Sequence, residues 1–462
     1  MSSLTTYEPQ SPSRARSRIL LLSGTAALGG FLFGYDTAVV SGAIGFLTEH
    51  FSLSAGMTGW AASSLLVGCM IGAGTSGWVS DRRGRKPVLL ACALLFALSA
   101  VVSALAPGIA VLTWARFIGG IAIGAVSMLS PMYIAEISPE RQRGRLVGLY
   151  QLAIVSGILG VFLLNWFIQS QGDHRWNVET GWRLMFGSLV IPASLFGVLL
   201  LFVPESPRWL YQAGRTDTAL NVLSRLNGQQ ESRRLLASWT GPTESGSVAE
   251  LFAPRWRRPL VLGIALAIFS QISGVNAVMY YAPEIFKSAG NTTSSAFAQT
   301  IVVGAVNLAL TLVALALVDR AGRRPLLLVG TAIQSLALGT AAWRFGSHIA
   351  GPALLLALLG FVAAFAVSTG PITWIAVSEI FPNRLRGRAM SVAVSCLWVA
   401  DWAVTQTFPM LNESAGPAAT FGIYAGCSLL CLGCLAVLMP ETKNRTLEQI
   451  EASWNSRTRA SH

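Results

Sequence analysis

The chain consists of long apolar segments that alternate with short polar ones. A transmembrane helix needs roughly 20 predominantly apolar residues to cross about 30 Å of hydrocarbon, and twelve segments meet that requirement. They lie near 19–46, 58–79, 87–106, 109–135, 145–168, 182–203, 259–287, 296–318, 325–345, 352–378, 388–410 and 417–438. The pattern predicts an all-α membrane protein with twelve transmembrane helices.

The longest polar stretch, 204–258, separates the first six predicted helices from the last six. It contains a helix-like run at 216–226, and a catalytic insert would need a larger core than this segment offers. We therefore expect short helices there. The predicted organisation is an N-terminal segment 1–18, an N-terminal six-helix half 19–203, the linker 204–258, a C-terminal six-helix half 259–438 and a tail 439–462.

Composition supports the membrane assignment. Hydrophobic residues make up 53% of the 462 positions and charged residues only 12%, whereas soluble domains carry about 25% charged residues. The mean hydropathy is +0.57. These values exclude a soluble enzyme of this size. The six cysteines all lie in apolar runs, so we expect small buried hydrophobic side chains there and no disulfide framework.

The formal net charge of +12 is distributed unevenly along the chain. If both termini and the linker are cytoplasmic, all but five of the 33 Lys and Arg residues fall on the cytoplasmic side. The five exceptions are Arg116, Arg175, Arg183, Lys287 and Arg344. Such a bias follows the positive-inside rule for an even number of spans. It explains the basic charge without nucleic-acid binding.

Three polar motifs of the first half recur in the second half. Residues 81–87 (Asp-Arg-Arg-Gly-Arg-Lys-Pro) recur at 319–325, 136–139 (Glu-Ile-Ser-Pro) at 379–382, and 204–206 (Pro-Glu-Ser) at 440–442. The nearly constant offset indicates a duplication. Two repeated membrane halves suggest a substrate path between them, with the halves rocking about a central site. The repeated charges either form a gate at the inner helix ends or only fix the orientation of the loops.

Ionisable residues also occur inside predicted spans, where a charge is costly without a partner or a cavity. Asp36 in the first span and Arg116 in the fourth can neutralise each other. Protonation of Asp36 would remove the partner of Arg116 and bias one conformation. The alternative is a permanent structural ion pair. Asp401 is a further acid in a span. Three interpretations of it remain open: a second protonatable site, a pore-facing acid that contacts the substrate, or a residue near water.

The seventh span is unusually polar for its depth. Gln271, Asn276 and Tyr280 carry amide and hydroxyl groups, which can donate and accept hydrogen bonds. Asn276 and Tyr280 share a helix face, and a bend at Gly274 would bring Gln271 toward Asn276. Pro283 is expected to end or kink the helix. Isolated polar or aromatic residues in other spans are Gln151, Asn307, Trp374 and Trp398. Each of them either contacts a substrate or serves interhelical hydrogen bonding or packing.

These motifs carry a resemblance. Over nearly its whole length the chain resembles the sugar porters of the major facilitator superfamily, and it looks most similar to bacterial proton-coupled xylose and hexose symporters. The motifs that match this family are 34–36 (Gly-Tyr-Asp), 116–120 (Arg-Phe-Ile-Gly-Gly), 204–210 (Pro-Glu-Ser-Pro-Arg-Trp-Leu), the two Asp-Arg-x-Gly-Arg motifs and 440–443 (Pro-Glu-Thr-Lys). The resemblance implies the major facilitator fold and transport by alternating access.

The resemblance also implies residue roles. The positions that match the sugar site are Phe33, Gln151, Gln271, Asn276, Tyr280, Asn307, Gly370, Trp374 and Trp398. Asp36 with Arg116 would couple the proton. The gate would consist of Arg85, Glu136, Arg143, Glu205, Arg323, Glu379, Arg386 and Glu441. The chain departs from xylose symporters at Ile158, Ser270 and Leu397, where those proteins have glutamines, and at Asp401, where relatives more often have a neutral polar residue.

The expected function is therefore proton-coupled symport of a hexose or pentose across the cell membrane. The partners implied are a monosaccharide, a proton and membrane lipid, with a monomer as the working unit. No enzyme chemistry, cofactor or metal site is expected, and no phosphate-binding loop suggests ATP use. The alternatives are a facilitative sugar uniporter, a membrane sugar sensor and a multidrug exporter.

Overall fold

A computed structural model describes residues 12–139, 142–239, 248–347, 352–381 and 383–441. Every regular element in these ranges is helical. The first half contains α1 Pro12–His50, α2 Ala55–Arg83, α3 Arg85–Ala104, α4 Ile109–Ile137, α5 Arg143–Gln169, α6 His174–Trp176, the π-helical turn η2 Asn177–Gly181, α7 Trp182–Gly187 and α8 Val190–Leu201. The last four of these together form the sixth span, His174–Leu201.

The linker forms short helices, as expected. They are α9 Pro207–Gln212, α10 Thr216–Asn227, α11 Gln229–Ser238 and the 3-10 helix η3 Val248–Phe252. The second half contains α12 Pro254–Ile272, α13 Val275–Ser288, α14 Thr293–Ala321, α15 Arg323–Gly346, α16 Pro352–Val367, α17 Thr369–Ile380 and α18 Asn383–Leu438.

The described residues hold 11 stretches that are long and apolar enough to cross a membrane. The last of them, Arg388–Leu438, has 51 residues. As one straight helix it would be about 77 Å long at 1.5 Å per residue, more than twice the hydrocarbon thickness. Gly416 breaks it with a left-handed φ of 80°. This stretch therefore contains two spans, and the expected twelve are all present.

Two spans that the sequence suggested as single segments are broken in mid-course. Gly274, with a φ of 83°, separates α12 from α13, which is the bend expected there. Pro283 lies just beyond a second kink at Tyr281, also as expected. The sequence predicts one helix over 352–378, and the structure differs, because Ser368 breaks that segment into α16 and α17. The Ser368 hydroxyl bonds the Ala364 carbonyl and receives the Gln334 amide, which stabilises the break.

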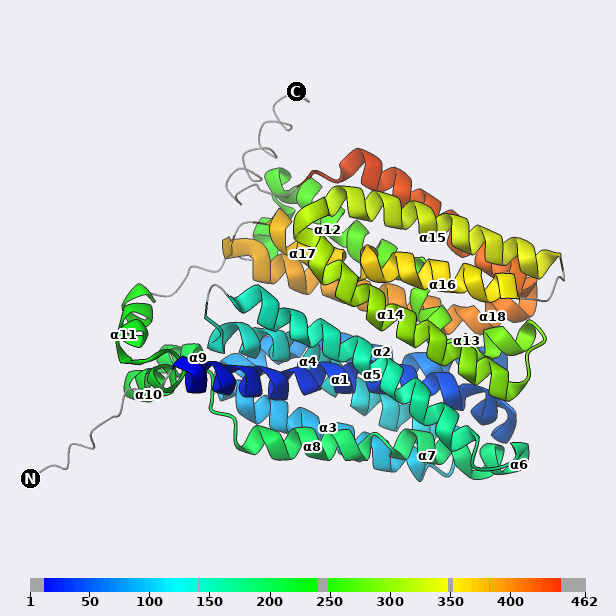
Figure 1. Ribbon diagram of the computed structural model, residues 1–462, viewed down its shortest axis with the longest axis horizontal. Helices are drawn as coiled ribbons and strands as arrows, with labels where there is room; N and C mark the ends of the chain where they lie inside the picture. The colour runs from blue at the N-terminus through cyan, green and yellow to red at the C-terminus, as the bar shows by residue number, and fades with distance from the viewer. Residues whose placement is uncertain (1–11, 140–141, 240–247, 348–351, 382, 442–462) are drawn as a thin grey trace, which may run out of the picture.

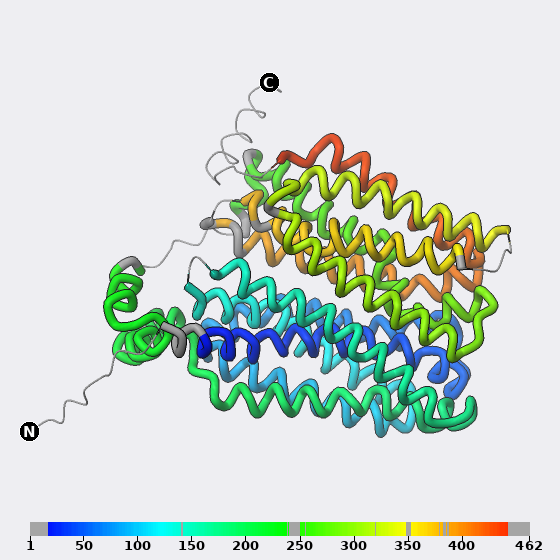
Figure 2. Tube along the Cα trace, in the orientation of Figure 1, coloured from blue at the N-terminus to red at the C-terminus, as the bar shows by residue number. Residues whose placement is uncertain are grey.

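The helices form two groups, α1 to α8 and α12 to α18, which lie against each other along the bundle (Figure 1). Within the groups the closest pairs include α2 with α4 and α15 with α18. Between the groups α2 contacts α18, α5 contacts α14 and α1 contacts α13. The short helices α9 to α11 lie outside the bundle at the end where α1 begins (Figure 2). We call this the linker end and the opposite end the far end.

The bundle exposes apolar side chains and buries the charged residues that lie within its spans. Large apolar side chains such as Ile191, Phe202, Leu336 and Val437 are at least 73% exposed, whereas Asp36, Arg116 and Asp401 are buried. This arrangement would be unstable in water and suits lipid, where hydrocarbon covers the outside and charges need partners inside.

Candidate functional site

The buried ion pair expected between the first and fourth spans is present. Asp36 on α1 and Arg116 on α4 meet with Asp36 Oδ1 3.2 Å from Arg116 Nη1, and the two side chains are 3% and 1% exposed. Arg116 Nη2 also donates to the Asp36 carbonyl oxygen at 3.4 Å. The guanidinium lies over the Phe186 ring, 5.1 Å from its centroid. Each charge thus depends on the other for compensation in an apolar setting.

The pair is incompletely satisfied. Asp36 Oδ2 and Arg116 Nε have no hydrogen-bond partner among the described residues. Asp36 Oδ2 lies beside Gly119, where an added Cβ would be 3.2 Å from it. A carboxylate with one oxygen paired and the other unoccupied can take a proton without first breaking a hydrogen bond at that oxygen.

The amides of the seventh span converge across the break at Gly274. Asn276 Nδ2 on α13 donates to Gln271 Oε1 on α12 at 2.8 Å. Gln271 Nε2 in turn donates to Ser270 Oγ at 3.1 Å. Residues 271 and 276 would point in different directions on a straight helix, so the left-handed Gly274 is what brings them together.

Asp401 lies on α18 and is 1% exposed. Its carboxylate accepts from Thr405 Oγ1 on the same helix at 3.3 Å. Tyr280 and Cys69 are within its electrostatic reach.

Aromatic residues from both helix groups also meet inside the bundle. Phe33 on α1 packs against Trp398 on α18, with ring centroids 5.7 Å apart. Trp398 Nε1 finds no hydrogen-bond partner in the described ranges. Tyr280 on α13 is buried and lies within electrostatic reach of Arg116 on α4 and Asp401 on α18.

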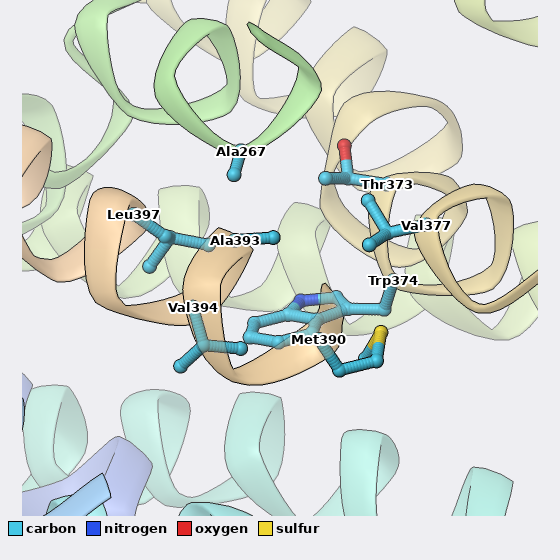
Figure 3. Close-up of a pocket in the computed structure, with 8 residues that line it drawn as sticks. All are labelled: Ala267, Thr373, Trp374, Val377, Met390, Ala393, Val394 and Leu397. Atoms are coloured by element: carbon cyan, nitrogen blue, oxygen red, sulfur yellow. The ribbon is translucent and has the colours of Figure 1, made fainter. Parts of the chain in front are cut away.

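The remaining expected sugar residues lie on other helices around the same region. Trp374 on α17 and Leu397 on α18 line a small apolar pocket with Ala267, Thr373, Val377, Met390, Ala393 and Val394, and Figure 3 shows the Trp374 ring beside Met390 and Val394. Gly370 lies in the first turn of α17, against Phe365. Gln151 on α5 is half-buried and Asn307 on α14 is buried. Within the described ranges, no hydrogen bond or ion pair joins these residues to the amide cluster.

Two of the expected gate arginines form equivalent ion pairs at the linker end. Arg85 binds Glu136 with Nη2 3.2 Å from Oε1, and it also binds Asp81 at 2.9 Å. In the second half Arg323 Nη2 lies 3.0 Å from Glu379 Oε1. Each of these pairs joins helices of one half.

Glu205 and Glu441 occupy matching places at the starts of α3 and α15. Glu205 accepts the backbone N–H of Arg85 at 2.9 Å, and Glu441 accepts the backbone N–H of Arg323 at 3.2 Å. A carboxylate at a helix N-terminus satisfies free N–H groups and compensates the helix dipole. The sequence paired these acids with the repeated arginines but did not indicate that the bond goes to the main chain.

Arg143 and Arg386 complete the expected gate set. Arg143 is exposed and its Nε donates to the Ala135 carbonyl at 3.1 Å, one residue before Glu136. The side chain of Arg386 lies outside the part of the chain that the structure describes.

Sequence reasoning missed a polar bridge at the far end. Gln406 on α18 accepts from Ser63 Oγ at 2.8 Å and donates to the Gly56 carbonyl at 2.9 Å, both on α2. Nearby, Lys287 pairs with Glu284 at 2.8 Å and lies 5.2 Å from the Phe46 ring centroid. The sequence feature that could have indicated this bridge is Gln406 itself, an isolated amide in the apolar segment 388–410.

Known proteins match this chain over almost its full length. It is 45% identical to the arabinose-proton symporter of Bacillus subtilis over 457 residues, covering 97% of this chain and 98% of the relative. It is 40% identical to the D-xylose-proton symporter of Escherichia coli over 484 aligned residues, covering 96% and 97%.

Solved structures match in the same way. The inward-open conformation of the xylose transporter XylE from Escherichia coli superposes with a TM-score of 0.85 at 37% identity, covering 94% of this chain and all of that one. The proton:xylose symporter XylE bound to 6-bromo-6-deoxy-D-glucose gives 0.81 at 38% identity, covering 95% and 99%. The family described as "Sugar (and other) transporter" matches residues 22–454. The chain belongs to this sugar transporter family, and it is a multi-pass membrane transporter and not an enzyme.

Proposed function

We propose that this protein is a proton-coupled monosaccharide symporter that works by alternating access. The observation that carries the proposal is a buried ion pair in the same helix bundle as a cluster of amides. Asp36 and Arg116 form the ion pair, Gln271 and Asn276 form the amide cluster, and Tyr280, on the same helix as Asn276, lies within electrostatic reach of Arg116. The arabinose- and xylose-proton symporters among the relatives make pentoses the first substrates to test.

The proton step rests on Asp36. A proton on Oδ2 neutralises the carboxylate and leaves the Arg116 charge without its counter-ion. That change destabilises the present packing of α1 against α4 relative to an arrangement in which Arg116 has another partner. Protonation thus shifts the balance between two conformations.

The sugar step rests on groups from both halves. Gln271, Asn276 and Tyr280 offer amides and a hydroxyl, Phe33 and Trp398 offer aromatic surface, and Trp398 Nε1 is an unused donor among the described residues. A monosaccharide bound there would contact α1 on one side and α13 and α18 on the other. Since α1 and α13 or α18 belong to different halves, binding would draw the halves together. Gln151, Asn307, Gly370 and Trp374 are proposed as further contacts.

We place the linker end in the cytoplasm, together with both termini, because the positive residues concentrate there. The Gln406 bridge and the contacts of α1 with α13 then close the outer side. The ion pairs of Arg85 with Glu136 and Arg323 with Glu379 are proposed as the inner gate, with Glu205 and Glu441 holding the helix starts. The halves 19–203 and 259–438 would be the rocking units within one monomer.

The deciding experiment uses the purified protein in proteoliposomes. Uptake of pentoses and hexoses is measured with and without an imposed inward proton gradient. Proton-coupled symport predicts accumulation above the external concentration only with the gradient. Uptake that never exceeds equilibration in either condition would identify a facilitative uniporter instead.

A further inference from the structure

The helices α16 and α17 form one span that is broken at Ser368, where φ is −122° and ψ is −96°. Pro371 is one cause, because it has no N–H to give to the carbonyl of Val367 in a continuous helix. It is not a sufficient cause. The counterpart of this span in the first half is α4, which reaches the repeated Glu-Ile-x-Pro motif at its end. That helix contains Pro131 and is continuous from Ile109 to Ile137.

A second element holds the break, and it is the side chain of Gln334 on α15. Gln334 Nε2 donates to Ser368 Oγ at 3.1 Å and to Thr369 Oγ1 at 3.0 Å. Ser368 Oγ in turn donates to the Ala364 carbonyl at 2.6 Å. An amide nitrogen has two N–H groups, so one serves the residue at the break and the other serves the first residue of α17. The amide thus ties α17 to α15 at the point where the span loses its helical continuity.

The surroundings of these bonds are closely packed. Gln334, Ser368 and Thr369 are 1%, 0% and 4% exposed. One turn earlier on α15, Gly330 lies against Ser368, and a Cβ added there would collide with that side chain. In α3, the counterpart of α15, the place of Gln334 is taken 238 positions earlier by Phe96, which offers no hydrogen bond. A buried hydroxyl that loses its partner is costly, so the break depends on the amide.

The angle of α17 determines where Trp374 lies. At 1.5 Å per residue Trp374 is about 9 Å beyond Ser368, so a swing of about 10° at the break displaces it by about 1.5 Å. Its ring lies beside Met390 and Val394 of α18 (Figure 3). Such apolar contacts are non-directional, whereas the hydrogen bonds of Gln334 have a preferred length and angle. The bonds of Gln334 therefore restrict the swing more closely than the packing of the ring does.

We propose that Gln334 is a positioning residue that fixes the angle of α17 at the break and thereby sets, through Trp374, the affinity of the site for its monosaccharide. The inference rests on the proposed function, in which Trp374 contacts the sugar. Gln334 lies on α15, which carries no residue of the proposed sugar site. Its effect on the sugar is therefore expected to pass through α17.

The first measurement is hydrogen–deuterium exchange of the purified protein, which does not depend on transport. Gln334→Met keeps the length of the side chain and removes both N–H donors. Amides of 369–380 are expected to exchange about fivefold faster than in wild type, while those of 293–318 keep their rate. Ser335→Ala is the matched control, because it removes a bond from α15 to the Ala425 carbonyl of α18 at 3.0 Å and leaves Gln334 in place. An unchanged rate over 369–380 in Gln334→Met would overturn the proposal.

The second measurement is sugar counterflow in proteoliposomes without a proton gradient, using D-xylose, L-arabinose, D-glucose and D-galactose. For the best sugar, Gln334→Met is expected to raise the half-saturation constant about fivefold and to keep the maximal rate within about twofold of wild type. Thr369→Val should raise the constant less, and Thr369→Ser, which keeps the hydroxyl, should match wild type. In a Trp374→Leu background, Gln334→Met should raise the constant no further, because the two residues act through one helix.

The remaining outcomes are separable. If wild type exchanges none of the sugars, the proposed function is wrong, and the role of Gln334 in sugar affinity is wrong with it. If wild type exchanges sugar and Gln334→Met keeps the half-saturation constant, only the positioning role is wrong. An equal increase of the constant in the Trp374→Leu background would place the effect elsewhere and overturn the role as well. Monodisperse elution of each variant excludes misfolding as the cause.

Discussion

Asp36 and Arg116 hold each other through one close pair of side-chain atoms, Oδ1 and Nη1, 3.2 Å apart in an almost fully buried setting. The second carboxylate oxygen of Asp36 is unpaired within the described residues. The arrangement compensates both charges and still leaves a place for a proton. We propose that this combination makes the pair a proton-coupling site, and the first two predictions test that role.

Asp36→Asn is expected to abolish accumulation of sugar against its gradient while leaving counterflow exchange within about twofold of wild type. An asparagine cannot take up and release the proton, yet it keeps a hydrogen-bond acceptor for Arg116. The measurement is uptake with an imposed proton gradient beside exchange without one. Asp217→Asn, on the exposed linker helix α10, is the matched control. Accumulation by the Asp36 variant at the wild-type level would contradict the role.

Arg116→Leu should destabilise the protein strongly. Removal of one partner of a buried ion pair costs about 3–5 kcal/mol because the other charge remains uncompensated. The double variant Asp36→Leu with Arg116→Leu should recover much of that loss, since neither charge remains. Thermal unfolding in detergent measures both. A double variant no more stable than Arg116→Leu would show that the pair contributes through packing and not through charge.

Asn276→Leu is expected to raise the half-saturation constant for sugar exchange at least tenfold. The change removes an amide proposed to contact the sugar and also the bond to Gln271 at 2.8 Å, and one lost hydrogen bond to a ligand is worth about 1–3 kcal/mol. Gln299→Leu is the control, because the Gln299 amide lies near the start of α14 and donates to the neighbouring Asn291. Equal constants for the Asn276 variant and wild type would remove this residue from the site.

Gln406→Leu should weaken closure at the far end. The change breaks the bonds to Ser63 and Gly56, which join α18 to α2. The expected result is a several-fold increase in labelling of a cysteine placed at position 56 by a membrane-impermeant thiol reagent. Thr407→Val alters only bonds within α18 and serves as the control. Identical labelling in both variants would show that Gln406 does not hold this contact.

Glu379→Gln should favour states open at the linker end. The substitution weakens the ion pair with Arg323 at 3.0 Å, which is proposed to take part in the inner gate. The ratio of labelling rates for cysteines at the linker end and the far end measures the shift. Glu231→Gln on α11 changes an exposed charge outside the bundle and provides the comparison. A ratio equal to that of wild type would argue for a fixed structural role of Glu379.

Several elements of the site could be anticipated because they follow from local rules. A charge inside a span needs a partner, which pointed to Asp36 with Arg116. The dense polar residues of the seventh span indicated an inward-facing cluster, and Gly274 indicated the bend that joins Gln271 to Asn276. In each case the chemical need was visible in the sequence, and the structure contains the contact that meets it.

Other elements depended on distant parts of the chain. The break at Ser368 is held by Gln334 of α15, 34 residues earlier. Glu205 bonds the main chain of Arg85, 120 positions away, and Gln406 bonds Ser63 across the two halves. The spacing of apolar residues along a helix does not determine which other helix packs against it, so these contacts could not be predicted from the sequence.

The sequence by itself determined the twelve spans, the repeated motifs and the uneven distribution of positive charge, because hydrocarbon thickness and the cost of burying charge act on each segment separately. Tertiary structure decided what those segments do together. It brought Glu205 to the start of α3 and Gln406 to Ser63 in the other half. The physical reason is that hydrogen bonds act over about 3 Å, so their partners are known only once the helices have packed.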